Sequence, residues 1–336
     1  MSCLTKTNIQ IWGVKKMLNN LTMDSPLYAR ILAWMDERFP FKNMPAWVVW
    51  YLLAAVIARY TVDQEYLTLG LHDVVGALIT SSFFLLLRVF DEHKDYELDC
   101  HNHPERVLQS GLITLWHLKV IGFLCIIAEL IWALHLDSGV GVVTISWVVM
   151  FGYSLLMAKE FFVGEWLEKR LVLYALSHQI IIPMTIWWTC VMGAPEAEPG
   201  MIIYWLMGLS FATGMTLEIV RKTRGPEEER DTVDSYSKVF GTQGSAYVVL
   251  VLATFMLLQM LAISGFIVSD SFYIGFSLIF LAYAFVLYNV LGFIRAPSLR
   301  GREKNEVACA LFMLIGYLVL ISAVVSERQI VLSLWV

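Results

Sequence analysis

Three aspartates, Asp91, Asp95 and Asp99, follow an apolar run at intervals of four residues. At this spacing they would lie along one side of a helix, where their carboxylates can converge on a hard cation such as Mg²⁺. Mg²⁺ is usually held by one or two carboxylates and shared with substrate phosphates, which need cationic partners of their own. The cations beside the aspartates are Arg88, Lys94 and Arg106. The pattern predicts a site that binds a diphosphate.

A second stretch rich in both charges spans residues 218–238. Gly225 and Pro226 are expected to end one helix and begin another. Its candidate metal ligands are Glu227, Glu228 and Asp231, and its candidate diphosphate contacts are Arg221, Lys222 and Arg224. Two plainer alternatives stay open, because acidic residues are common in the first turn of a helix and basic residues also set membrane topology. Glu218 either joins this cluster or pairs with Arg221 or Lys222.

The composition shows what must position these residues. Hydrophobic residues make up 58% of the chain and charged residues 16%, and the mean hydropathy is +0.65. These values are typical of a polytopic membrane protein. Runs long enough to cross the bilayer as helices occupy residues 46–60, 71–90, 112–134, 139–157, 171–192, 201–219, 244–267, 272–294 and 307–325. The predicted fold is an all-α membrane bundle of about nine transmembrane helices.

Basic residues predict the orientation of this bundle. All but Arg59 and Arg328 of the 24 Lys and Arg lie before the first run, in alternate connections between the runs, or in the parts of two runs that flank the 91–111 connection, as Arg88 and Lys119 do. Because basic loops stay in the cytoplasm, the N-terminus is predicted to be cytoplasmic and the C-terminus to lie on the opposite side. Both charged stretches then face the cytoplasm, and a two-half bundle would bring them together over one diphosphate cavity.

Residues 1–45 are predicted to form a cytoplasmic, interfacial N-terminal segment, and residues 46–336 the transmembrane catalytic domain. A helix starting at Pro26 would place Leu27, Ile31, Trp34 and Met35 on one side, as an amphipathic surface helix requires. The segment lacks the features of a cleavable signal. The five cysteines show no metal-binding or disulfide spacing, and a net charge of −5 gives no sign of a nucleic-acid partner.

The first charged stretch resembles the UbiA superfamily of intramembrane prenyltransferases, whose first motif reads approximately NDxxDxxxDxxNxPxRPL. The matching positions are Asp91-Glu92, Asp95, Asp99, Asn102, Pro104, Arg106 and Leu108. This chain departs from the motif in having Asp91 for the leading asparagine and Val107 for the second proline. The second stretch lacks the usual DxxxD, since Arg224 stands where its first aspartate would be and Glu228 stands at the last.

The resemblance implies a Mg²⁺-dependent enzyme in which Asp91, Asp95, Asp99 and Glu228 act in catalysis on a prenyl diphosphate. Asn102 and Lys159 would be further diphosphate contacts, although a lysine that sets topology is the plainer interpretation of Lys159. The carbocation left after ionisation needs a dry pocket with aromatic faces. The candidates for its lining are Trp187, Trp188, Trp205 and His178. His178 is also a candidate base.

The DEHKDYELD and EIVRKTRGPEE segments resemble the fungal membrane-bound terpene cyclases of this superfamily. That likeness implies cyclisation of farnesyl diphosphate to a sesquiterpene, in the endoplasmic reticulum membrane if the protein is fungal. Prenyl transfer to an aromatic or quinone-precursor acceptor is the alternative. A cation transporter is a more distant one, because its ion site would lie near the bilayer midplane. No protein partner is required. Glu129, inside the third run, is expected to form a structural hydrogen bond.

Overall fold

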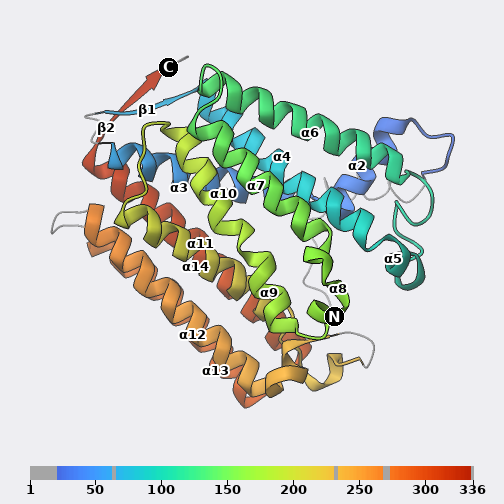
Figure 1. Ribbon diagram of the computed structural model, residues 1–336. Helices are drawn as coiled ribbons and strands as arrows, with labels where there is room; N and C mark the ends of the chain where they lie inside the picture. The colour runs from blue at the N-terminus through green and yellow to red at the C-terminus, as the bar shows by residue number, and fades with distance from the viewer. Residues whose placement is uncertain (1–20, 63–65, 231–233, 268–272, 334–336) are drawn as a thin grey trace. The chain divides into compact units, whose positions relative to one another are not determined.

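A computed structural model of the protein describes residues 21–62, 66–230, 234–267 and 273–333 (Figure 1). The chain divides into two compact units, and each is considered by itself. Unit 1 contains the described residues up to Pro45 together with Ser81–Ala128. Unit 2 contains the described residues of Ala46–Thr80 and Glu129–Val336. Helices α4 (Leu71–Lys94) and α6 (Leu115–Leu136) run from one unit into the other.

Unit 1 is built around the first charged stretch. Besides parts of α4 and α6, it contains helix α2 (Leu27–Arg38), the short 3₁₀ helix η1 (Phe41–Asn43) and helix α5 (Tyr96–Asn102). Its core contains Trp34, Val89, Leu108, Ile113 and Leu118. On the apolar side of α2, Ile31 and Met35 pack against this core while Leu27 is exposed, and a place for α2 at the membrane surface stays a prediction. The fully buried Trp34 therefore attaches α2 to the segment that carries the aspartates.

Unit 2 holds most of the remaining helices. These are α3 (Met44–Thr61), α7 (Val142–Ala158), α8 (Gly164–Glu168), α9 (Leu171–Gln179), α10 (Ile181–Gly193), α11 (Met201–Arg221), α12 (Tyr236–Ile267), α13 (Tyr273–Arg295) and α14 (Leu299–Glu327). Two 3₁₀ helices, η2 (Glu160–Phe162) and η3 (Pro226–Glu228), lie between them. Helices α11, α12, α13 and α14 pack side by side, and α10 packs against both α7 and α11 (Figure 1).

The predicted bundle of about nine membrane helices is confirmed. In the described residues, eight helical segments are long and apolar enough to cross a membrane, and α7, at 17 residues, is a shorter apolar helix at the ninth predicted position. The protein is therefore an integral, multi-pass membrane protein. Two helices begin earlier than predicted, α12 at Tyr236, with a kink at Gly241 (φ 73°), and α14 at Leu299. Their first turns are polar, so the apolar run marks only the later part of each helix.

A short pair of strands was not predicted. Strand β1 (Tyr66–Gly70) pairs in parallel with β2 (Gln329–Ser333), so that Tyr66 lies opposite Gln329 (Figure 1). Next to β1, the buried Arg59 donates to Asp73 Oδ1 at 2.7 Å and to the Thr68 carbonyl at 2.6 Å. Arg59 is one of the two exceptions to the basic-residue pattern. Its charge is satisfied inside the fold, which explains the exception.

Glu129 has the structural role expected of it. The Trp147 indole N–H donates to Glu129 Oε2 at 2.9 Å, and both side chains are buried. Trp147 also stacks on Phe151 with ring centroids 5.0 Å apart. A buried carboxyl group is stabilised when its oxygens accept hydrogen bonds, and this contact ties α6 to α7 within unit 2.

Candidate functional site

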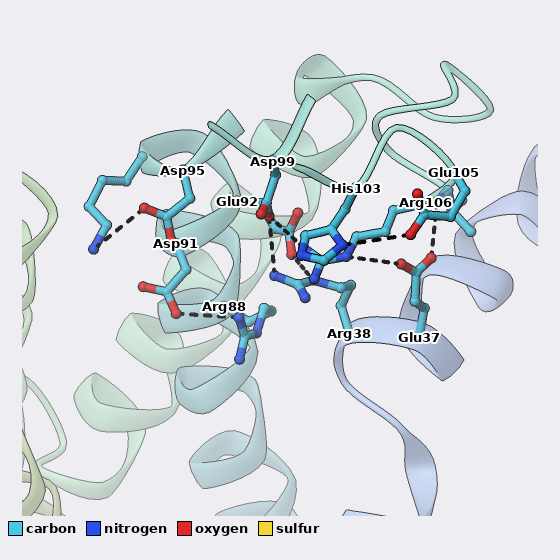
Figure 2. A network of polar contacts seen from close by, with 12 residues as sticks. Glu37, Arg38, Arg88, Asp91, Glu92, Asp95, Asp99, His103, Glu105 and Arg106 are labelled. Atoms are coloured by element: carbon cyan, nitrogen blue, oxygen red, sulfur yellow. Dashed lines mark hydrogen bonds and ion pairs between the residues drawn. The ribbon is translucent and has the colours of Figure 1, made fainter. Parts of the chain in front are cut away.

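The first charged stretch is interrupted at Asp95. Helix α4 ends at Lys94 and α5 begins at Tyr96, while Asp95 has φ −93° and ψ 5°. The prediction that the three aspartates lie along one side of a single helix is therefore wrong. Asp91 lies in the last turn of α4, Asp95 at the break and Asp99 in α5. The change in backbone direction separates Asp99 from the other two, as Figure 2 shows.

Asp91 and Asp95 form the more exposed part of this site. Asp91 Oδ2 lies 3.5 Å from Arg88 Nη1, and Asp95 Oδ1 lies 3.7 Å from Lys94 Nζ. The two carboxylate side chains are 48% and 44% exposed. Ion pairs this long, between carboxylates this exposed, contribute little free energy. Arg88 and Lys94 thus lie beside the aspartates, and their role as diphosphate contacts stays a prediction.

Asp99 is held more firmly. Its Oδ2 accepts from Arg106 Nη1 at 2.7 Å and lies 3.7 Å from Arg38 Nη2. Arg38 also donates to Glu92, whose side chain is fully buried. On the other side of Arg106, Glu37 Oε1 lies 3.7 Å from its Nε. Figure 2 shows this chain of charges joining the end of α2 to α4, α5 and the loop after it.

Glu37 and Arg38 are site residues that sequence reasoning missed. Glu37 also accepts a hydrogen bond of 2.9 Å from the Val107 amide. Partial burial raises the pKa of Glu37 above its usual value, although that hydrogen bond and the nearby Arg106 oppose the shift. Both residues are the last two of α2 and lie outside the apolar side of its amphipathic pattern. The sequence shows only that Glu37 and Arg38 lie near the end of a helix. It does not show that they contact Val107 and Glu92, which lie far along the chain.

Asp91 and Asp95 supply two carboxylates, which is enough for a Mg²⁺ ion that also binds substrate phosphate. No group of three His, Cys, Asp or Glu side chains within the described ranges is arranged to hold a metal ion. Mg²⁺ does not require such a group, because it commonly takes one or two protein carboxylates and completes its coordination with water and substrate phosphate. Two partly exposed carboxylates beside two cations match that requirement.

In the second charged stretch, Glu218 has the alternative role expected of it. It pairs with Arg221 Nη2 at 2.5 Å and with Lys222 Nζ at 2.7 Å. These are contacts between residues three and four apart at the end of α11, where such pairs face each other. Within the described residues, the two predicted diphosphate contacts Arg221 and Lys222 are therefore engaged with an acid of their own helix.

Glu227 and Glu228 contact the start of α14. Glu227 Oε1 accepts from the Leu299 amide at 2.6 Å, and Glu228 Oε1 accepts from Arg302 Nε at 2.8 Å. Glu228 Oε2 also accepts from the Gly225 amide at 3.1 Å. Backbone hydrogen bonds lower the pKa of Glu227. The predicted turn at Gly225-Pro226 is confirmed, although the helix that begins there is the 3₁₀ turn η3. These contacts hold that turn in place, and a metal role for the two residues stays a prediction.

Several predicted residues remain without a tested role. Asp231 lies outside the described residues. Asn102 ends α5 and is exposed, and Lys159 follows α7 and is exposed. The Arg224 amide donates to Ser237 Oγ at 2.6 Å, which places its backbone against the start of α12. The first cluster lies in unit 1 and the second in unit 2, so their meeting over one cavity also stays a prediction.

The predicted cation-pocket residues all lie in unit 2. Trp187 and Trp205 are partly buried, whereas Trp188 is fully buried in α10. His178 Nδ1 lies 2.8 Å from the Tyr174 carbonyl, so this nitrogen is assigned as the N–H donor, and its ring stacks on Tyr174 with centroids 4.0 Å apart. Complete burial shows that Trp188 packs in the core of unit 2. Lining of a carbocation pocket stays a prediction for all four residues.

Comparisons with known proteins address the whole chain. Residues 48–315 match the UbiA prenyltransferase family. A solved structure from a study of digeranylgeranylglyceryl phosphate synthase in membranes is 17% identical, with a TM-score of 0.61, and the match covers 88% of this chain and 99% of that one. The apo structure of a UbiA homologue from Aeropyrum pernix K1 is 12% identical, with a TM-score of 0.57, over 81% and 97%. No curated protein gives a significant match.

Proposed function

Because this chain belongs to the UbiA prenyltransferase family of membrane enzymes, we propose that it ionises a prenyl diphosphate at Asp91 and Asp95. The observation that carries this proposal is the pairing of these two exposed carboxylates with Arg88 and Lys94. Such a pair of acids can share a metal-bound diphosphate, and the cations can then turn from the acids to the phosphate oxygens. Enzymes of the UbiA prenyltransferase family use prenyl diphosphates as substrates.

The residues of unit 1 would act on the leaving group. The allylic C–O bond breaks with its electron pair moving to diphosphate, so negative charge grows on the phosphate oxygens. Arg88, Lys94 and Arg106 stabilise that charge by donating hydrogen bonds. Mg²⁺, when bound, supplies further neutralisation of the leaving group. Asp99, held by Arg106 and Arg38, keeps the loop in a geometry that presents Arg106.

The carbocation has two possible fates, and a specific observation favours each. The form of the two charged stretches resembles fungal membrane-bound terpene cyclases, which supports internal cyclisation of farnesyl diphosphate to a sesquiterpene and loss of a final proton, with His178 as the candidate base. The similarity of the fold to the solved structure from the study of digeranylgeranylglyceryl phosphate synthase supports transfer of the prenyl group to an acceptor. The acceptor would then lose a proton. Both begin with the same ionisation.

One experiment tests the common step and separates the two fates. Membranes that contain the protein are incubated with Mg²⁺ and farnesyl diphosphate alone, and hydrocarbons and released diphosphate are measured. We expect diphosphate release that EDTA and Asp95→Ala both abolish. Glu97→Ala is the matched control, because Glu97 is an exposed acid two residues away with no ion pair among the described residues.

The products then distinguish cyclisation from prenyl transfer. A cyclic hydrocarbon that is absent with Asp95→Ala supports the cyclase. Prenylated product that forms only when an aromatic or quinone-precursor acceptor is added supports the transferase. Turnover that Asp95→Ala leaves unchanged would remove the site from consideration.

The enzyme is further proposed to lie in the endoplasmic reticulum membrane if fungal, with its N-terminus in the cytoplasm.

A further inference from the structure

A positively charged cleft opens where α13 ends and α14 begins. It has a volume of about 460 Å³ and lies within unit 2. Its basic lining residues are Arg295, Arg300 and Lys304, and all three side chains are exposed. The cleft also contains Asn289 and Ser298, but their side chains are engaged within their own helices: Asn289 donates to the Phe285 carbonyl, and Ser298 accepts from the Gly301 amide. The three cations therefore dominate its chemistry.

These cations are not neutralised by nearby acids. In the part of the chain that the structure describes, no ion pair joins Arg295, Arg300 or Lys304 to a carboxylate. Their neighbour Arg302 differs, because it is paired with Glu228 at 2.8 Å and with Glu306 at 3.1 Å. Arg302 thus belongs to the contacts that hold η3 against α14, while the other three present unbalanced charge to the cleft. Such a site favours an anion.

An exposed apolar stripe leads along α13 to the cleft. Its members recur at alternating intervals of four and three residues, which places them on one side of the helix. They are Ile274, Leu278, Leu281, Phe285 and Tyr288, with exposures from 45% to 79%. Tyr288 also lines the cleft. In an integral membrane protein, an exposed apolar helix side lies against acyl chains, so this stripe and the cleft together match an amphiphile with a negative head.

We propose that this cleft binds the phosphate-bearing headgroup of an anionic phospholipid whose acyl chains lie along the α13 stripe. Guanidinium groups bind phosphate with paired hydrogen bonds, and an ammonium group adds a mobile point charge. Basic residues at the end of a membrane helix attract anionic lipid for the same reason. The cleft lies on the side that the basic-residue pattern predicts to be cytoplasmic. The proposal does not depend on the reaction that the protein catalyses.

Native mass spectrometry of the full-length protein tests the proposal. The protein is exchanged into detergent with equal amounts of phosphatidylglycerol and phosphatidylcholine, and the bound lipids are counted. We expect retained phosphatidylglycerol to exceed phosphatidylcholine, and Arg300→Gln with Lys304→Gln to reduce that preference by about tenfold. The control, Lys42→Gln with Lys119→Gln, removes the same charge from exposed lysines outside the cleft and should keep the preference.

Equal loss of preference in both double variants, or no preference in the wild type, would overturn the proposal. If the double variant does not fold, Arg295→Gln tests the same cleft without altering α14. Inorganic phosphate added in excess, against sodium chloride at the same ionic strength, separates the two sources of phosphate. Retention of the lipid supports a phospholipid site, whereas specific displacement by phosphate would assign the cleft to a soluble phosphate compound.

Discussion

At the scale of single residues, the acids of the charged stretches differ in the strength of their ion pairs and in their exposure. Asp91 and Asp95 keep weak, exposed partners, whereas Asp99 is bound by two arginines and Glu228 by Arg302. A ligand that displaces a weak surface ion pair loses little free energy, while one that displaces a buried pair loses much more. The same motif therefore contains both ligand-accessible and structural acids.

Glu129 provides a prediction at this scale. Glu129→Leu should lower the free energy of unfolding by about 1–3 kcal/mol, because the buried Trp147 indole N–H loses its acceptor. Glu129→Gln is the matched variant, since its amide oxygen can still accept that hydrogen bond, and it should cost much less. Thermal unfolding of the purified protein in detergent checks both. Equal destabilisation by the two variants would show that the hydrogen bond from Trp147 does not account for the stability that Glu129 contributes.

At the scale of elements, α2 forms part of the candidate site. Its Trp34 enters the core of unit 1, and its last residues, Glu37 and Arg38, contact both ends of the aspartate segment. The contact between Arg38 and Glu92 joins residues 54 positions apart. Because this pair includes a fully buried acid, its loss should affect the folding of unit 1 as well as the position of Asp99.

We expect Arg38→Gln to destabilise the protein by about 3–5 kcal/mol, because Glu92 is left buried without its cation. Replacing both residues by methionine should restore most of that stability, since no charge then remains buried. The comparison is made by thermal unfolding, with Asp36→Asn on the exposed side of α2 as control. Failure of the double variant to recover any stability would contradict the assignment of this ion pair.

The start of α7 gives a prediction for pH. Asp137 accepts hydrogen bonds from the amides of Gly141, Val143 and Thr144 at 2.9, 3.2 and 2.7 Å. Partial burial alone raises the pKa of Asp137, but hydrogen bonds from Thr144, Val143 and Gly141 outweigh it and leave the pKa below its usual value. A lowered pKa in the folded state means that the stabilisation is complete above the unfolded value and is lost as the pH falls through the folded one.

Asp137→Asn should therefore be less stable than wild type by about 0.3–1 kcal/mol at pH 7, because the neutral amide can still accept hydrogen bonds but lacks the negative charge that is favourable at a helix N-terminus. The difference should begin to shrink below about pH 4, where Asp137 of the unfolded chain becomes protonated, and should be lost as the pH falls through the lower pKa of the folded state. Unfolding measured from pH 3 to pH 7 checks this prediction. A difference that stays constant across the range would show that the charge of Asp137 does not contribute.

At the scale of the whole molecule, membrane sidedness is the main prediction. Unique thiols introduced by Glu198→Cys and Glu303→Cys should react with an impermeant maleimide from opposite sides of sealed vesicles. Both positions are exposed, and the background would carry Cys3→Ser and Cys100→Ser, since Cys125, Cys190 and Cys309 are buried. The thiol at position 303 should be cytoplasmic. Labelling of both from one side would overturn the predicted topology.

The sequence alone determined the features that repeat locally along the chain. In the part of the chain that the structure describes, apolar runs predicted the positions of the eight membrane-spanning segments and of α7. The spacing of Asp91, Asp95 and Asp99 with Asn102, Pro104 and Arg106 indicated the family that residues 48–315 match. The turn at Gly225-Pro226 was also predictable, because the backbone restrictions of these residues act within a few positions. Each of these signals is carried by neighbouring residues.

Only the tertiary structure decided which charges are committed. Glu92 meets Arg38, Glu228 meets Arg302 across 74 positions, and β1 meets β2 from the far end of the chain. The break at Asp95 that turns Asp99 toward Arg106 likewise accompanies packing with α2. The spacing of residues along the sequence does not predict such contacts. Their energy depends on burial and on a partner that folding brings near.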